Sequence, residues 1–216
     1  MSDLDEAIGS DEAALAEYAD VDVTPEAILA KLERCTRASS APYAKDSGGV
    51  ADIHVCKLRN AVFFKADMDI DCDGKQTPEC NRQTDPHFQP QTAAVDSTGK
   101  PLDSAALPFI VVPGVSTRWN YKNAGISMGT VGAVIYDGKI EYGIVGDVGP
   151  KTIIGEASYA MAKNLGINPH PSYGGVGSGV TYVIFTGPTA KVTKNEDHAE
   201  AVTLAKKRAA QMLVEN

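Results

Sequence analysis

A predicted β-hairpin in the second half of the chain sets the strongest limit on the fold. Two runs rich in β-branched and apolar residues, Val131–Tyr136 and Lys139–Val145, flank the dipeptide Asp137-Gly138. This dipeptide favours a two-residue hairpin turn, because both central positions of such a turn adopt positive φ. Five further apolar runs predict additional short strands at Ile53–Val55, Ala61–Ile70, Phe109–Val112, Ile126–Gly129 and Val180–Phe185.

Helices are predicted towards both ends of the chain. Thr24 and Pro25 supply the cap and the first position of a helix that runs to about Cys35. Glu196–Leu213 has an apolar stripe at helical spacing and predicts a C-terminal helix that packs on the core. Many short strands with few helices indicate a mainly β protein with flanking helices (α+β). We expect a small β-barrel, of the double-psi type by analogy, with a two-sheet β-sandwich as the alternative.

The first 22 residues differ in composition from the rest of the 216-residue chain. Residues 1–22 contain eight acidic residues and no basic one, which is typical of a flexible segment. Residues 23–216 are long enough to bury a substantial core and are predicted to form a single domain. No apolar run approaches the length that would span a membrane.

Two carboxylates follow the predicted hairpin. Asp147 appears where Gly149 and Pro150 interrupt the strand, and Glu156 is expected in the first turn of a helix over Ala157–Leu165. A purely structural role is the simplest interpretation of such acids, because a carboxylate near a helix N-terminus stabilises the helix dipole. The pair also suits general acid and base catalysis.

Four aspartates occupy alternate positions along and beyond one predicted strand. They are Asp67, Asp69, Asp71 and Asp73. Side chains alternate between faces along a strand, so these carboxylates are predicted to share one face, an unfavourable arrangement unless a cation binds there. The spacing also matches the first half of a calcium-binding loop. However, the bidentate Glu of such a loop is replaced by Cys80, so we expect no metal and no cofactor.

Several short motifs follow one another between about residues 30 and 187. They are Ala66–Gly74, Cys80, Asp85–Phe88, Thr92-Ala93, Leu102–Pro108, Gly146-Asp147, Gly155–Ser158, Leu165–Ile167 and Val180–Phe185. In order and approximate spacing, these motifs resemble the family 75 glycoside hydrolases, which are endo-chitosanases best known from fungi. The resemblance implies that Asp147 and Glu156 are catalytic and that the reaction inverts the anomeric centre. The loop Val148–Gly155 is shorter than in the fungal members.

The composition agrees with a cationic polysaccharide as the partner. Chitosan is a glucosamine polymer with protonated amines, and the chain has a formal charge of −8 and a pI near 5.0. The same negative charge disfavours binding to nucleic acid. We also expect a monomer and no binding to membranes. Candidate substrate-binding residues are the four aspartates and two aromatic residues that could stack on sugar rings, Trp119 and Tyr142.

Inverting glycosidases use one protonated and one ionised carboxyl group, separated by about 6.5–9.5 Å. Glu156 follows the apolar pair Ile153-Ile154, where burial would raise its pKa, whereas Asp147 lies among glycines that water can reach. We therefore expect Glu156 to act as the acid and Asp147 as the base. The alternative is a non-catalytic carbohydrate-binding or calcium-stabilised module on the same fold.

The four cysteines allow three disulfide pairings. Cys72 and Cys80 enclose a short loop and are natural partners, which leaves Cys35 with Cys56; four free thiols are the alternative. Disulfides favour a secreted, extracellular protein. Because Met1–Asp5 lacks the features of a signal peptide, export would require a leader outside this sequence.

Overall fold

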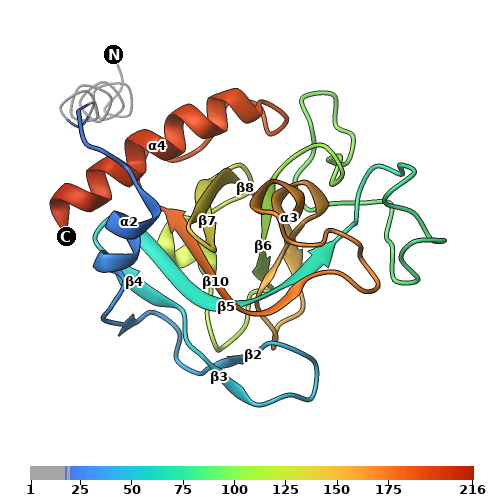
Figure 1. The fold of residues 1–216 in the computed structure, drawn as a ribbon, viewed down its shortest axis with the longest axis horizontal. Coiled ribbons are helices and arrows are strands. Elements are labelled where there is room, and N and C mark those ends of the chain that lie inside the picture. Colours follow the sequence, from blue (N-terminus) through green and yellow to red (C-terminus); the bar gives the residue numbers. More distant parts are fainter. Residues whose placement is uncertain (1–17, 19) are drawn as a thin grey trace.

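Six strands of the computed structural model form a closed β-barrel (Figure 1). The structure describes residue 18 and residues 20–216, so most of the acidic segment 1–22 lies outside the described residues. The barrel strands, in their order around the sheet, are β5 (Ala61–Asp71), β10 (Val176–Phe185), β7 (Val131–Tyr136), β8 (Lys139–Gly149), β6 (Phe109–Pro113) and β9 (Glu156–Ser158). The predicted small barrel with flanking helices is therefore confirmed, and the alternative sandwich is not observed.

The short strand β9 closes the barrel. It pairs in parallel with β5 on one side and antiparallel with β6 on the other. A second parallel pair joins β6 to β8, and the remaining neighbours are antiparallel. Closure leaves no unpaired edge among these six strands, which removes a site for edge-to-edge aggregation.

The remaining elements surround the barrel. The helices of the described residues are α2 (Pro25–Lys31), α3 (Tyr159–Leu165), α4 (His198–Glu215) and the 3₁₀ turn η1 (Tyr121–Ala124). The small strands are β1 (Thr36–Arg37), β2 (Tyr43–Ala44), β3 (Ala51–Ile53) and β4 (Cys56–Leu58). Strands β1 and β4 extend the sheet from β5, while β2 and β3 form a separate pair. No helix among the described residues is long and apolar enough to cross a membrane.

Alternate residues of the barrel strands enter two separate core clusters. One cluster contains residues of all six barrel strands, among them Phe64 and Ala157. The other joins Phe63 to buried residues of the outer helices, such as Ile28 of α2 and Ala205 of α4. Because α2 and α4 lie outside the barrel (Figure 1), the first cluster fills its interior and the second covers its outer face.

The predicted hairpin is confirmed, with β7 and β8 joined at Asp137 and Gly138. Both turn residues have positive φ, 48° and 70°, as a hairpin turn of this type requires. Strand β8 is longer than predicted, because a bulge opposite Ile110 and Val111 carries it past Gly146 to Gly149. Asp147 therefore lies within the strand.

Two other local predictions were wrong. Glu156 is not in the first turn of a helix, since Ser158 is the N-cap of α3 and its side chain accepts a hydrogen bond from the Met161 amide. The three residues before the helix instead form β9. Residues Ile126–Gly129 do not form a strand, because they lie in the turn between η1 and β7.

Two disulfides link Cys35 to Cys56 and Cys72 to Cys80, the same pairs that the sequence favoured. The second begins the long segment between β5 and β6, which crosses the outer face of the barrel. Cys72, Cys80 and Phe88 form a small core of their own within this segment. The segment is thereby anchored beside the end of β5, where the predicted aspartates lie.

Candidate active site

Three strand pairings place the two predicted catalytic carboxylates in one row. Val111 of β6 is the register partner of Asp147 on β8 and of Glu156 on β9. Glu156 is in turn the partner of Asp69 on β5. Val111 belongs to the outer cluster, so the row lies on the outer face of the barrel. The parallel pairing of β9 with β5, which the sequence did not reveal, brings Asp69 beside Glu156.

These residues line an acidic cleft with a volume of about 590 Å³. Six carboxylates contribute to it, and none of the described residues that line it is Lys or Arg. The carboxylates are Asp69, Asp71, Asp73, Asp85, Asp147 and Glu156. Such a lining repels anions and attracts a cationic ligand.

Glu156 has a strongly perturbed pKa. Burial raises the pKa of this carboxyl to about 7, and the negative charges of Asp69 and Asp147 add to the effect. Because β9 precedes the α3 cap, Glu156 is not in the helix and gains no hydrogen bond from its first turn. Its carboxyl group therefore retains a proton close to neutral pH.

Asp147 has donors that favour its ionised form. Its Oδ1 accepts hydrogen bonds from the amides of Ala93, at 2.8 Å, and Val148, at 2.7 Å. Burial raises the pKa of Asp147 above its ordinary value, and these two hydrogen bonds oppose that rise. The two carboxyls thus differ in environment, as acid and base groups must.

Asp71 and Asp73 lie beside Asp147. One carboxylate oxygen of each of the three lies within 4.8 Å of the others. The Asp71 side chain is buried and accepts a hydrogen bond from the Asp73 amide at 2.7 Å. Burial raises the pKa of Asp71 well above its usual range, with further contributions from the charges of Glu156 and Asp147. Burial also raises the pKa of Asp73, to about 6.

The structure does not bring all predicted residues to the cleft. Asp67 shares a face with the other aspartates, yet it is only 4% exposed and does not line the cleft. Trp119 is buried against Tyr121 in the barrel interior cluster. Tyr142 is buried in the outer cluster, where Lys206 of α4 lies 5.9 Å from its ring centre.

Residues outside the predicted set complete the cleft. Asp85, His87 and Gln89 approach from the segment between β5 and β6. Ser172, from the loop before β10, faces them and donates a hydrogen bond of 2.6 Å to the Thr84 carbonyl. The motif Asp85–Phe88 was a sequence signal for the first group, whereas the Ser172 contact depends on tertiary structure alone.

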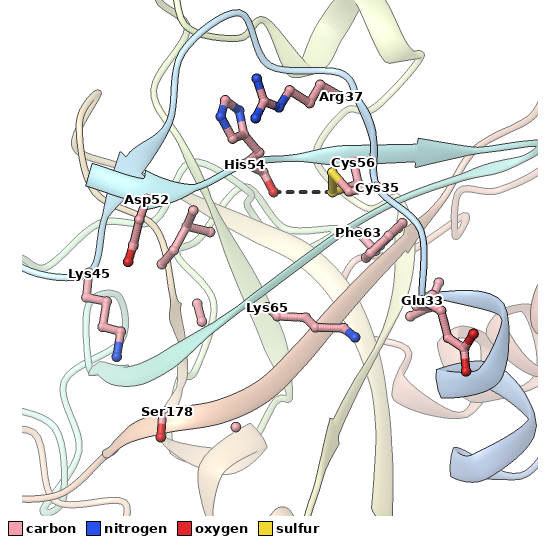
Figure 2. A pocket seen from close by; sticks show the side chains of 14 residues that line it. Glu33, Cys35, Arg37, Lys45, Asp52, His54, Cys56, Phe63, Lys65 and Ser178 are labelled. Carbon is pink, nitrogen blue, oxygen red and sulfur yellow. Dashed lines mark hydrogen bonds between the residues drawn. A yellow bond between two sulfur atoms is a disulfide. The ribbon is translucent and has the colours of Figure 1, made fainter. Parts of the chain in front are cut away.

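A second cavity of about 580 Å³ lies elsewhere along β5 and has a different charge (Figure 2). Arg37, Lys45 and Lys65 line it, together with the acids Glu33 and Asp52. Its basic residues outnumber its acidic ones. On chemical grounds the acidic cleft is the better candidate for a cationic sugar polymer, although both cavities have nearly the same volume.

Paired carboxylates in an acidic cleft are the groups that a glycoside hydrolase requires, and comparison with known proteins identifies the family. Residues 68–212 match the family described as fungal chitosanase of glycosyl hydrolase group 75. The chain belongs to this family. The match includes Asp147, Glu156 and all residues that line the acidic cleft.

Curated proteins that resemble this chain are named endo-chitosanases. Endo-chitosanase B of Aspergillus oryzae is 32% identical over 151 residues, which cover 62% of this chain and 63% of the relative. Endo-chitosanase C of the same species is 34% identical over 145 residues, covering 62% of this chain and 35% of the relative. An endo-chitosanase of Aspergillus fumigatus is 32% identical, covering 62% and 60%. The chain thus spans less than two thirds of the length of these relatives.

Proposed function

We propose that the protein is a secreted endo-chitosanase that hydrolyses β-1,4 links between glucosamine units with inversion at the anomeric carbon. Glu156 is the general acid and Asp147 the general base. The observation that carries the proposal is the row Glu156, Val111, Asp147 on the floor of an acidic cleft. Membership of the chitosanase family and the two disulfides support the substrate and the extracellular location.

The strand geometry supports inversion. Asp147 and Glu156 lie on either side of β6, so two inter-strand steps of about 4.8 Å separate their Cα atoms by about 9–10 Å. Retaining enzymes need carboxyls about 5–5.5 Å apart, whereas inverting enzymes need about 6.5–9.5 Å to admit a water molecule. Two side chains that extend in parallel from these positions keep their carboxyl groups at a separation closer to the inverting range than to the retaining one.

The environments support the assignment of roles. Glu156, with a pKa of about 7, holds the proton that the leaving glycosidic oxygen requires. Asp147, held by two amides, accepts a proton from the water that attacks the anomeric carbon on the opposite face. Asp73 and Asp85 are placed to attract protonated amines of the polymer.

The test compares reducing-end release from highly deacetylated chitosan by the wild type, Asp147→Asn and Glu156→Gln. Asp137→Asn, at the exposed hairpin turn, removes one negative charge elsewhere and is the control. We expect turnover to fall by at least about 10³-fold in both cleft variants, with unchanged melting temperature, and to persist in the control. Undiminished turnover in either cleft variant would show that its carboxyl has no catalytic role.

A non-catalytic carbohydrate-binding module predicts a different result. Such a module would bind chitosan without releasing reducing ends, and Glu156→Gln would leave binding unchanged. The anomer of the first product, followed by NMR, tests inversion separately. An initial α-anomer from the β-linked polymer supports it, whereas an initial β-anomer would indicate retention.

A further inference from the structure

A second group of carboxylates meets at the edge of the acidic cleft. Asp46 comes from the loop between β2 and β3, whereas Asp67 and Asp69 belong to β5. One carboxylate oxygen of each residue lies within 4.8 Å of the other two. The sequence run of four aspartates is therefore divided: Asp71 contributes to the active-site group, and Asp67 to this one.

These three carboxylates form no ion pair among the described residues. Both ion pairs of the described residues involve other carboxylates. Asp67 is only 4% exposed, and its Oδ1 has no hydrogen-bond partner. Lys45 is the nearby base, but its ammonium group donates a hydrogen bond to the Gly177 carbonyl at 2.6 Å. A buried carboxylate oxygen that lacks a hydrogen-bond partner is unfavourable unless a cation compensates it.

We propose that Asp46, Asp67 and Asp69 bind a divalent cation, with Ca²⁺ as the ion that fits best. Three oxygens that all lie within 4.8 Å of one another have a common point within about 2.8 Å of each, close to the 2.3–2.6 Å of Ca²⁺–oxygen bonds. Asp46 and Asp69 are exposed, so water molecules complete the coordination shell. Mg²⁺ fits less well, because it demands shorter bonds and releases its own water reluctantly.

A free ion suits this group better than an ammonium group on a sugar. Asp67 is buried and does not line the cleft, so the bulk of a pyranose ring keeps a substrate amine away from it. The active-site group of Asp71, Asp73 and Asp147 differs in its hydrogen bonds to the backbone. There, Asp71 accepts the Asp73 amide and Asp147 accepts two amides, so backbone donors already compensate these carboxylates.

The ion would reinforce the junction between the β2–β3 region and the barrel, where Ala44 already exchanges backbone hydrogen bonds with Thr152 and Ile154. The loop of Asp46 precedes β3, while Asp67 and Asp69 lie on a barrel strand beside β9. Gly155 packs against the Asp67 carboxylate, because a Cβ atom at this glycine would lie 2.2 Å from Asp67 Oδ1. Bound Ca²⁺ therefore stabilises the β2–β3 region against the barrel.

The test is calorimetric titration of CaCl₂ into EDTA-treated, desalted protein, with melting temperatures at matched ionic strength. We expect one saturable site with a Kd of about 10⁻⁴–10⁻³ M, as in extracellular calcium modules. A Ca²⁺ concentration of ten times Kd should raise the melting temperature by roughly 3–6 °C. Asp67→Asn and the exposed Asp46→Asn should each weaken binding at least tenfold. MgCl₂ is the comparison titrant and should bind more weakly.

Two controls keep the site distinct from the cleft. Asp137→Asn and Asp147→Asn should both bind Ca²⁺ as the wild type does, and the second tests the active-site carboxylates directly. Absence of saturable Ca²⁺ binding overturns the proposal. So does wild-type affinity in Asp46→Asn or loss of binding in Asp147→Asn. The readout is binding, so the result does not depend on whether the protein cleaves chitosan.

Discussion

The substitution Gly149→Ala tests whether the position of Glu156 controls turnover. A Cβ atom at Gly149 would lie 2.9 Å from Oε2 of Glu156 and 3.2 Å from Cγ1 of Val111. The backbone of Gly149 has no positive φ, so alanine is compatible with the strand conformation. The closer contact is with the end of a flexible side chain, which moves at little cost. The fold should therefore persist while the carboxyl group is displaced.

The size of the displacement sets the expected loss. Atoms in favourable contact lie about 3.5 Å or more apart, so the Glu156 carboxyl must retreat by roughly 0.5 Å. Misplacement of a catalytic group by about 1 Å can lower the rate about 10²-fold. A displacement of about half that size should change the logarithm of the rate by about half as much, which is a loss of about tenfold. The melting temperature should change by no more than about 3 °C, because the Gly149 backbone conformation is retained.

The assay is reducing-end release from chitosan at saturating substrate, with Gly177→Ala as the control. Gly177 lies on β10 and a Cβ atom there would have no neighbour within 4 Å. We expect kcat to fall about tenfold in Gly149→Ala and to stay within about twofold of wild type in Gly177→Ala. Full turnover in Gly149→Ala, with the fold intact, would refute the inference that Glu156 must hold its observed position.

Three further predictions concern pH and covalent links. Asp73→Asn removes a charge that raises the pKa of Glu156, so the alkaline limb of the pH–rate profile should move about 0.5 pH unit lower; an unmoved limb argues against Glu156 as the acid. The folded-state pKa values of Asp67 and Asp73, about 6, and Glu156, about 7, lie above their unfolded values near 4. The folded protein therefore binds more protons between about pH 4 and 7, so its stability should decrease as the pH rises through that window, by roughly 1–3 kcal/mol for each group after solvent screening. A melting temperature that is higher at pH 8 than at pH 5 would contradict this sign. Replacing either disulfide by serines should cost about 2–3 kcal/mol in chemical denaturation. Only loss of Cys72–Cys80 should also lower turnover, because Cys72 lines the cleft, and Cys35–Cys56 is the matched control.

Local sequence patterns predicted most of the barrel strands. Asp137-Gly138 gave the hairpin because turn type depends on two adjacent residues, and both adopt the required positive φ. The alternation of Asp67, Met68 and Asp69 gave the correct faces of β5, with Met68 in the barrel interior. These are short-range properties, which a single sequence contains.

The errors occurred where tertiary pairing overrides local preference. Residues Glu156–Ser158 look like the start of a helix, but pairing with β5 and β6 forces them into a strand, and Ser158 becomes the cap. Asp46 was not predicted near Asp67, because the loop of β2 and β3 meets β5 only in the folded chain. Trp119 was a candidate for sugar stacking by residue type alone, and packing places it in the core.

The short loop between Asp147 and Glu156 need not alter the spacing of the pair. Both residues are register partners of Val111, so β6 fixes their separation. The loop connects β8 to β9 and also pairs with Ala44 of β2. Lengthening the loop should therefore have little effect on catalysis. Lys151 and Thr152 are exposed and neither belongs to a strand, so a Gly-Ser insertion between them leaves the residues paired with β6 unchanged.

We expect this insertion to cost less than about 1 kcal/mol, since loop-closure entropy grows only slowly with length. Turnover should remain within about threefold of wild type, measured by reducing-end release beside the melting temperature. As a control, the same insertion within β9, between Glu156 and Ala157, breaks the pairing with β5 and β6 and should abolish activity. A large loss of turnover from the loop insertion, with an unchanged melting temperature, would mean that the loop itself positions the carboxylates or the substrate.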